Sequence, residues 1–204
     1  MGRPRRGSDD EILVKAREAF VEHGPALSTV AIAQQVGLTQ AVLFQRFGTK
    51  NELMRRALSP PEVAPFVPLL EAGPTEEDIH TQLVRLANAI GNHFDVYFPC
   101  WSMLRATGLD VMEGILMPEV PPPVRSQRAL AAWFRAAIAT HRFRLLDPEA
   151  TAILFLGAMQ ARSMMKHLFG DRVIGIDQER FVDNLVDVVL GDAQTTPLPE
   201  TIHP

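Results

Sequence analysis

The chain has 204 residues, of which 47% are hydrophobic and 22% charged, so it can build a core and is not disordered throughout. No apolar run approaches the ~18 residues that a membrane helix needs, and no signal peptide follows the basic start. We therefore expect a soluble, cytoplasmic protein. The single cysteine, Cys100, excludes an intrachain disulfide or a multi-cysteine zinc site, and we expect neither a metal nor a cofactor.

The net charge of -4 is unevenly distributed along the chain. Residues 1–58 contain nine Lys/Arg and six Asp/Glu, whereas residues 59–204 contain eleven Lys/Arg and eighteen Asp/Glu. A basic front and an acidic remainder indicate that only the front approaches a polyanion.

A short basic arm, residues 1–7, opens the chain. Its arginines, Arg3, Arg5 and Arg6, are either solvated or reach phosphates or a minor groove, and the sequence leaves both readings open. The first helix is predicted to begin at Ser8, which forms a capping box with Glu11, and to end at Gly24.

The segment from residue 28 to residue 53 predicts a helix-turn-helix. Ser28 or Thr29 caps a short helix, Gly37 permits the turn, and Thr39 caps a second helix. Helical spacing assigns one set of residues to the inside: Val30, Ala33, Val36, Val42, Leu43 and Phe47. The other side of the second helix is left free to contact a partner, and it carries Gln40, Ala41, Phe44 and Gln45.

A fourth helix is predicted to begin at Thr49. Lys50 lies in its first turn, where the helix dipole disfavours a cation unless an anion such as a phosphate lies opposite. The alternative is an ordinary surface lysine. Five prolines between Ser59 and Pro74 break any continuous helix there and predict a connection between two domains.

The rest of the chain predicts further helices. One runs from Thr75 to about Phe98 and is stopped by Pro99, and a second covers residues 100–109. Residues 111–123 are irregular or contain one short helix. Later helices cover residues 124–141, 147–170 and 177–191, and residues 194–204 form a flexible tail.

The last two helices are apolar over more than one side. A helix that is apolar around most of its circumference is buried on two sides, and the simplest second surface is another copy of the chain. We therefore expect a symmetric homodimer through four helices. Its predicted contacts are Leu156, Met159, Phe181, Leu185, Val188 and Val189.

Residues 8–58 resemble the DNA-binding domain of the TetR family of bacterial transcriptional regulators. The resemblance is carried by residues in a specific order and spacing: Ile12-Leu13 with Ala16, Ala19 and Phe20; Gly24; Ser28-Thr29-Val30 with Ile32-Ala33; Val36-Gly37-Leu38-Thr39; Leu43-Phe44 with Phe47; and Lys50 with Leu53. Beyond residue 58 the resemblance is architectural only.

The resemblance implies an all-α protein of about nine helices. Residues 1–58 would form the DNA-binding domain and residues 75–193 a helical ligand-binding and dimerisation domain, with residues 59–74 between them. It implies a regulator, most often a repressor, that binds double-stranded DNA as a dimer on a palindromic operator. The DNA contacts would be Thr29, Thr39, Gln40, Ala41, Phe44, Gln45, Arg46 and Lys50.

Within that set, Gln40, Ala41 and Gln45 would face base edges. Thr29, Arg46 and Lys50 would contact phosphates, which position the protein without specifying sequence. The family usually has tyrosine where this chain has Phe44, so one phosphate hydrogen bond is lost there.

The resemblance also implies that a small molecule enters the second domain and changes the distance between the two DNA-binding domains of the dimer. Aromatic and methionine side chains with a few polar groups suit a largely apolar effector. The candidate wall is His93, Tyr97, Cys100, Trp101, Met103, Leu104, Met112, Met117 and Trp133, and the same residues are also compatible with a plain core.

The sequence offers two alternative functions. An enzyme would use Cys100 with His93 and Asp95, but two residues that are two apart on a helix point to different sides, so no catalytic residue is predicted. The other alternative is a helical ligand-sensing module that does not bind DNA. The basic front and the polar outer positions of residues 40–46 argue against it.

Overall fold

The computed structural model describes residues 7–109, 120–140 and 147–191, which form ten helices and no strand. Two of these helices, α5 (Val67–Glu71) and α9 (Asp171–Ile174), have five residues or fewer. The all-α prediction is confirmed. None of the described helices is long and apolar enough to span a membrane. The predicted tail and most of the basic arm lie outside the described residues.

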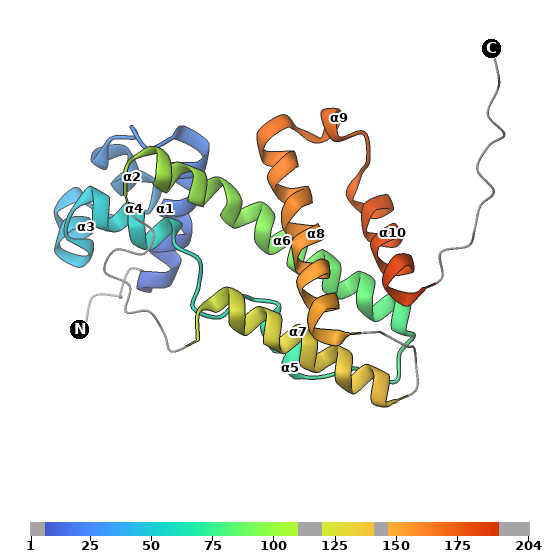
Figure 1. Cartoon of the computed structure of the whole chain (residues 1–204). Coiled ribbons are helices and arrows are strands. Elements are labelled where there is room, and N and C mark those ends of the chain that lie inside the picture. Colours follow the sequence, from blue (N-terminus) through green and yellow to red (C-terminus); the bar gives the residue numbers. More distant parts are fainter. Residues whose placement is uncertain (1–6, 110–119, 141–146, 192–204) are drawn as a thin grey trace, which may run out of the picture. The chain divides into compact units, whose positions relative to one another are not determined.

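The chain divides into two compact units, residues 1–64 with 92–122 and residues 65–91 with 123–204. The first unit contains α1 (Asp9–His23), α2 (Thr29–Gln35), α3 (Gln40–Phe47) and α4 (Lys50–Leu58) (Figure 1). Ser8 and Glu11 form the predicted capping box at the start of α1. Gly37 makes the turn between α2 and α3 with a φ of 75°, which favours glycine.

The core of the first unit is a single apolar cluster drawn from α1 to α4 and from the end of α6 (Ile79–Ala106). Its largest buried side chains include Phe20, Ile32, Leu43 and Phe47. Arg17 of α1 donates from Nε to the carbonyl of Ala57 at 2.8 Å, which ties α1 to α4.

Helix α6 corrects the prediction that a helix ends before Pro99, because it continues through this proline to Ala106. An internal proline costs about 3 kcal/mol, since it removes a hydrogen bond and clashes with the preceding turn. Cys100 and Leu104, which follow the proline, are completely buried in the first unit's core. Their burial offsets the penalty and keeps the chain helical.

The second unit contains α5, the first part of α6, α7 (Pro122–Ala139), α8 (Pro148–Phe169), α9 and α10 (Gln178–Leu190). The buried residues Phe66, Val67 and Leu70 show that the proline-rich segment packs into this unit from residue 65 onward. A Cβ added to Gly91 would lie 2.7 Å from the Cε of Met159, so the glycine permits close approach of α8 to α6.

Candidate DNA-binding site

The outer side of α3 is the candidate reading surface. Thr39 caps the helix by accepting a hydrogen bond from the backbone N–H of Val42 at 3.3 Å. Leu43 and Phe47 are buried on the inner side of α3. Gln40, Ala41 and Gln45 therefore point outward, where all three are exposed. Phe44 is half-buried at the edge of the same surface.

Gln40 is held in place by a residue of the preceding helix. Its Nε2 donates a 2.7 Å hydrogen bond to Oγ1 of Thr29, the first residue of α2. Ser28 rather than Thr29 caps α2, by accepting from the backbone N–H of Ala31, so the Thr29 hydroxyl remains available to Gln40. A side chain that is already oriented loses less conformational entropy when it binds.

Lys50 is the first residue of α4 and is half-buried. Thr49 caps this helix by accepting from the backbone N–H of Glu52 at 3.1 Å. The helix start and the lysine together supply a positive dipole end and a full positive charge, which suits a phosphate.

Arg46, a predicted phosphate contact, faces the beginning of α1. Its two terminal nitrogens donate to the carbonyl oxygen of Gly7, each at 3.3 Å, and its Nη2 also contacts Oδ1 of Asp9. The other carboxylate oxygen of Asp9 lies 3.8 Å from Nη2 of Arg56. The sequence gives no signal for this cluster, because Asp9 and Arg46 are 37 residues apart.

Two residues predicted to point inward are exposed instead: Val30 at 51% and Val42 at 39%. The helices α2 and α3 have only seven and eight residues. This is too few for the spacing of apolar residues to distinguish the buried side of the helix from the side next to it. Ile32 takes the buried position in α2 that was assigned to Val30.

The predicted effector residues are distributed over both units. Cys100 and Leu104 are completely buried in the core of the first unit, and Tyr97 is buried with the Arg17 guanidinium 4.9 Å from its ring centre. Trp133 is buried in the second unit, with its ring 5.7 Å from that of Phe134. His93, Trp101 and Met103 are half-buried, whereas Met112 and Met117 lie outside the described residues.

Cys100 and His93 do not have the chemistry of a nucleophile and its base. Burial raises the pKa of the Cys100 thiol to about 11, and its Sγ donates to the carbonyl of Val96 at 3.2 Å. Burial also lowers the pKa of His93 to about 4. A reactive cysteine needs a lowered pKa, so this thiol is a core side chain. The described residues contain no group of three His, Cys, Asp or Glu side chains able to hold a metal ion.

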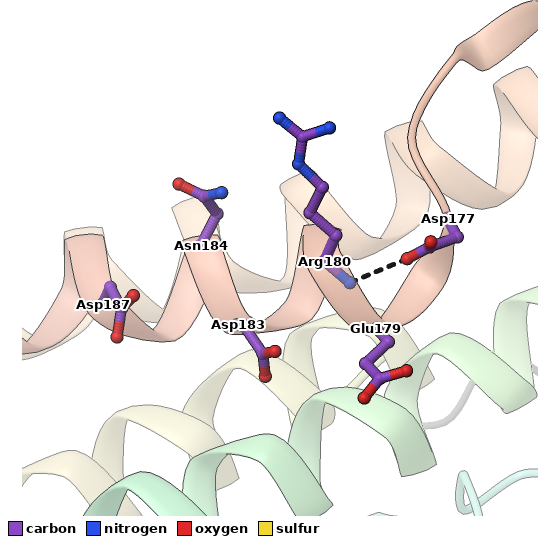
Figure 2. A pocket seen from close by; sticks show the side chains of 6 residues that line it. All are labelled: Asp177, Glu179, Arg180, Asp183, Asn184 and Asp187. Carbon is purple, nitrogen blue, oxygen red and sulfur yellow. Dashed lines mark hydrogen bonds between the residues drawn. The ribbon is translucent and has the colours of Figure 1, made fainter.

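A hollow of about 280 Å³ lies along α10 and is lined only by polar residues. Figure 2 shows Asp177, Glu179, Arg180, Asp183, Asn184 and Asp187 around it, with the carboxylate of Asp177 accepting from the backbone N–H of Arg180 at 2.8 Å. None of the predicted effector residues lines this hollow, and its polar wall does not suit an apolar molecule.

The outward side of α8 in the second unit is apolar. Leu154 is 69% exposed and Leu168 is 57% exposed, with Met165 between them at helical spacing. On α10, Val188 is 66% exposed, and Phe181 is half-buried. We call these exposed positions, Leu154, Ala161, Met165, Leu168 and Val188, the apolar face.

Most of this face was missing from the predicted dimer contacts. Of the predicted set, Leu156, Leu185 and Val189 are half-buried, while Met159 is buried within a single chain. The spacing of Leu154, Ala161, Met165 and Leu168 by seven, four and three residues would have revealed the face, because it forms one stripe separate from the buried one.

The fold and this site define a class: the described residues form an all-helical protein with an N-terminal helix-turn-helix. Residues 12–57 match the sequence model of the bacterial regulatory proteins of the tetR family. The match covers most of the segment from α1 to α4, so this part of the chain is similar to that family.

Solved structures of TetR-family regulators share the fold over most of the chain. PfmR from Thermus thermophilus is 23% identical with a TM-score of 0.58, covering 90% of this chain and 98% of its own. SCO0520 from Streptomyces coelicolor is 22% identical with a TM-score of 0.60, covering 93% and 99%. The fatty acid degradation regulator FadR from Bacillus halodurans is 15% identical with a TM-score of 0.61, covering 95% and 98%. No curated protein matches the chain.

Proposed function

We propose that this protein is a TetR-family transcriptional regulator, a ligand-responsive repressor that acts in the cytoplasm and binds a palindromic operator as a dimer. Each α3 would enter a major groove, with the two helices about 34–36 Å apart. The observation that carries the proposal is the exposed, polar outer side of α3, with Gln40 oriented by Thr29 and Lys50 at the start of the next helix.

In this proposal the exposed residues of α3 read bases. Gln40 and Gln45 can each make two hydrogen bonds to an adenine, and Ala41 can contact a thymine methyl group. Lys50, Thr39 and the hydroxyl of Thr29 would contact phosphates, which fix the register of the helix on the duplex. Phe44 would contribute its ring alone, because it has no hydroxyl group.

The dimer would form through the apolar face of α8 and α10. Apolar surface gains about 25 cal/mol for each Å² removed from water, and a continuous exposed stripe is typical of an interface rather than of free surface. Phe181, Leu185 and Val189, which are half-buried in one chain, would complete the contact. A self-complementary pair of helices gives a closed two-fold assembly.

The effector would be small and largely apolar, because the half-buried members of the predicted wall, Trp101 and Met103, are apolar or aromatic. His93 would add one neutral polar group at physiological pH, since burial holds its pKa near 4. The effector releases DNA only if it binds the released conformation more tightly than the bound one.

Fluorescence anisotropy with labelled DNA from the regions flanking the gene tests the proposal. We expect specific binding that weakens steeply with salt, because Lys and Arg release counterions from the phosphates. The alternative, a ligand-sensing module without DNA binding, predicts no salt-sensitive specific binding to any of these fragments.

A further inference from the structure

Asp9, at the start of α1, lies between two arginines of the first unit. Its Oδ1 accepts a hydrogen bond from Nη2 of Arg46 on α3, and its Oδ2 is 3.8 Å from Nη2 of Arg56 on α4. The guanidinium groups of Arg46 and Arg56 also lie near the ring of Phe47, at 5.9 Å and 4.9 Å from its centre. One carboxylate therefore faces two of the cations of the basic front.

Arg46 has a further acceptor at the same place. Both of its terminal nitrogens donate to the carbonyl oxygen of Gly7 at 3.3 Å. The planar guanidinium thus contacts the backbone just before α1 and the first carboxylate of α1 at once, and its side chain is only 30% exposed. Both terminal nitrogens of Arg46 are therefore engaged by acceptors at the start of α1.

We propose that Asp9 holds Arg46 back from the DNA, so that Arg46 is a positioning residue that fixes the start of α1 against α3 and not a phosphate contact. The proposal rests on the proposed DNA binding through α3. The Asp9–Arg46 pair is neutral as a unit. If Arg46 moved to a DNA phosphate, it would exchange the Asp9 carboxylate for another anion, and Asp9 would be left facing the DNA. We therefore expect the Asp9–Arg46 pair to release no counterion from the DNA.

The contact between Arg46 and Gly7 involves the last residue of the basic arm. Arg5 and Arg6 immediately precede Gly7 in the sequence, and Gly7 is the residue whose carbonyl Arg46 holds. Arg46 would therefore act on DNA binding indirectly, because it holds Gly7, the last residue of the arm, beside α3.

The salt dependence of operator binding tests this assignment, because each phosphate contact adds about 0.9 to the slope of log K against log salt. Asp9→Asn releases Arg46, and the slope is expected to steepen by about 0.9. Adding Arg46→Gln to this variant removes the released cation without changing the net charge relative to wild type, and the slope is expected to return to the wild-type value.

Two single variants calibrate the measurement. Asp10→Asn removes the same charge from the neighbouring residue, which is exposed and is not paired with Arg46 in the described structure, and it should leave the slope unchanged. Lys50→Gln removes a proposed phosphate contact and should flatten the slope by about 0.9.

Three outcomes would overturn the assignment. An unchanged slope in Asp9→Asn, with a slope flattened by about 0.9 in Arg46→Gln alone, would show that Arg46 already contacts a phosphate. A steeper slope that persists in Asp9→Asn/Arg46→Gln would show that Arg56, and not Arg46, makes the additional phosphate contact. The same steepening in Asp10→Asn would show a general effect of charge.

A measurement without DNA separates this inference from the proposed function. In a double-mutant cycle at low salt, the drop in melting temperature of Asp9→Asn/Arg46→Gln should be smaller than the sum of the two single drops. Additive drops would overturn the Asp9–Arg46 pair even if DNA binding is confirmed. Coupled drops together with no DNA binding would contradict the proposed function and leave the pair intact.

Discussion

The outer side of α3 and the apolar face of α8 and α10 are both exposed surfaces of helices whose other sides are buried. On α3 the exposed residues include Gln40 and Gln45, whereas on α8 they are Leu154, Met165 and Leu168. Polar side chains remain hydrated until a polar partner replaces the water, while apolar ones gain free energy whenever another apolar surface covers them. The chemistry of an exposed surface, more than its exposure, indicates its partner.

The largest expected effect comes from converting the apolar face into a charged one. In Leu154→Glu/Leu168→Glu, dimerisation would bury carboxylates without partners, at a cost of several kcal/mol per charge. We expect a monomer by size-exclusion chromatography with light scattering. Operator affinity should fall at least ~100-fold, because two linked heads bind far more tightly than one.

Gln160→Glu is the matched control for this prediction, since it adds a carboxylate at an exposed polar position of α8. This variant should stay dimeric and retain operator binding. A dimeric Leu154→Glu/Leu168→Glu protein would contradict the role given to the apolar face.

Removing the Gln40 amide should relax base discrimination without preventing binding. A bidentate contact to a base contributes about 1–3 kcal/mol of discrimination, so Gln40→Ala should reduce the preference at one base pair by about 5- to 150-fold. Affinities measured for all four base pairs at each operator position would show this. Base preferences identical to those of the wild type would rule out Gln40 as a reading residue.

Thr29 provides a conservative test of the hydrogen bond that orients Gln40. Thr29→Val keeps the shape of the side chain but removes the acceptor of the 2.7 Å bond, and it should weaken discrimination at the same base pair. Thr29→Ser keeps the hydroxyl group and should preserve discrimination. Equal base preferences in these two variants would show that the bond does not position Gln40.

Lys50→Ala should weaken binding to all DNA sequences alike. A phosphate contact carries no sequence information, so the expected change is a salt slope flattened by about 0.9 with base preferences unaltered. Titrations at several salt concentrations, with the operator and with an unrelated duplex, measure both quantities. A loss restricted to the operator would instead indicate a base contact.

The smallest expected effect is a pH dependence of stability at His93. Its pKa is about 4 in the folded protein and 6.5 in the unfolded chain, so between these values only the unfolded chain binds the proton. The free energy of unfolding should therefore fall as pH drops from 6.5 towards 4. After solvent screening, we expect a loss of about 1 kcal/mol at pH 5.

Urea unfolding at pH 7 and pH 5 for the wild type and His93→Gln isolates this contribution. The variant has no titrating ring at this position, so its stability should decrease less between the two pH values. An equal decrease in both proteins would show that His93 titrates normally.

The sequence predicts the fold well where local signals agree. Ser8 and Thr39 cap the helices that they were predicted to cap, because capping depends on residues only three apart. The sequence fails at Pro99, where burial of Cys100 and Leu104 outweighs the local penalty of the proline. That burial depends on packing against residues far away in the chain, which a local pattern cannot contain.

The candidate site likewise has features that the sequence predicts and features that it does not. Helical spacing predicted the outward positions of Gln40, Ala41 and Gln45, although it wrongly placed Val42 inside the same helix. The hydrogen bond between Thr29 and Gln40 and the pairing of Asp9 with Arg46 join different helices, so they appear only once the helices are packed. The exposure of these three residues was therefore predictable from the sequence, whereas the contacts between helices were not.

Selection of bound duplexes from a random pool by the wild-type protein tests the central claim most directly. A dimer that places two α3 helices in successive major grooves should enrich a palindrome whose half-sites are centred about 10 base pairs apart. Enrichment of a single unpaired half-site would contradict the dimeric arrangement. No enrichment over the starting pool would contradict sequence-specific DNA binding itself.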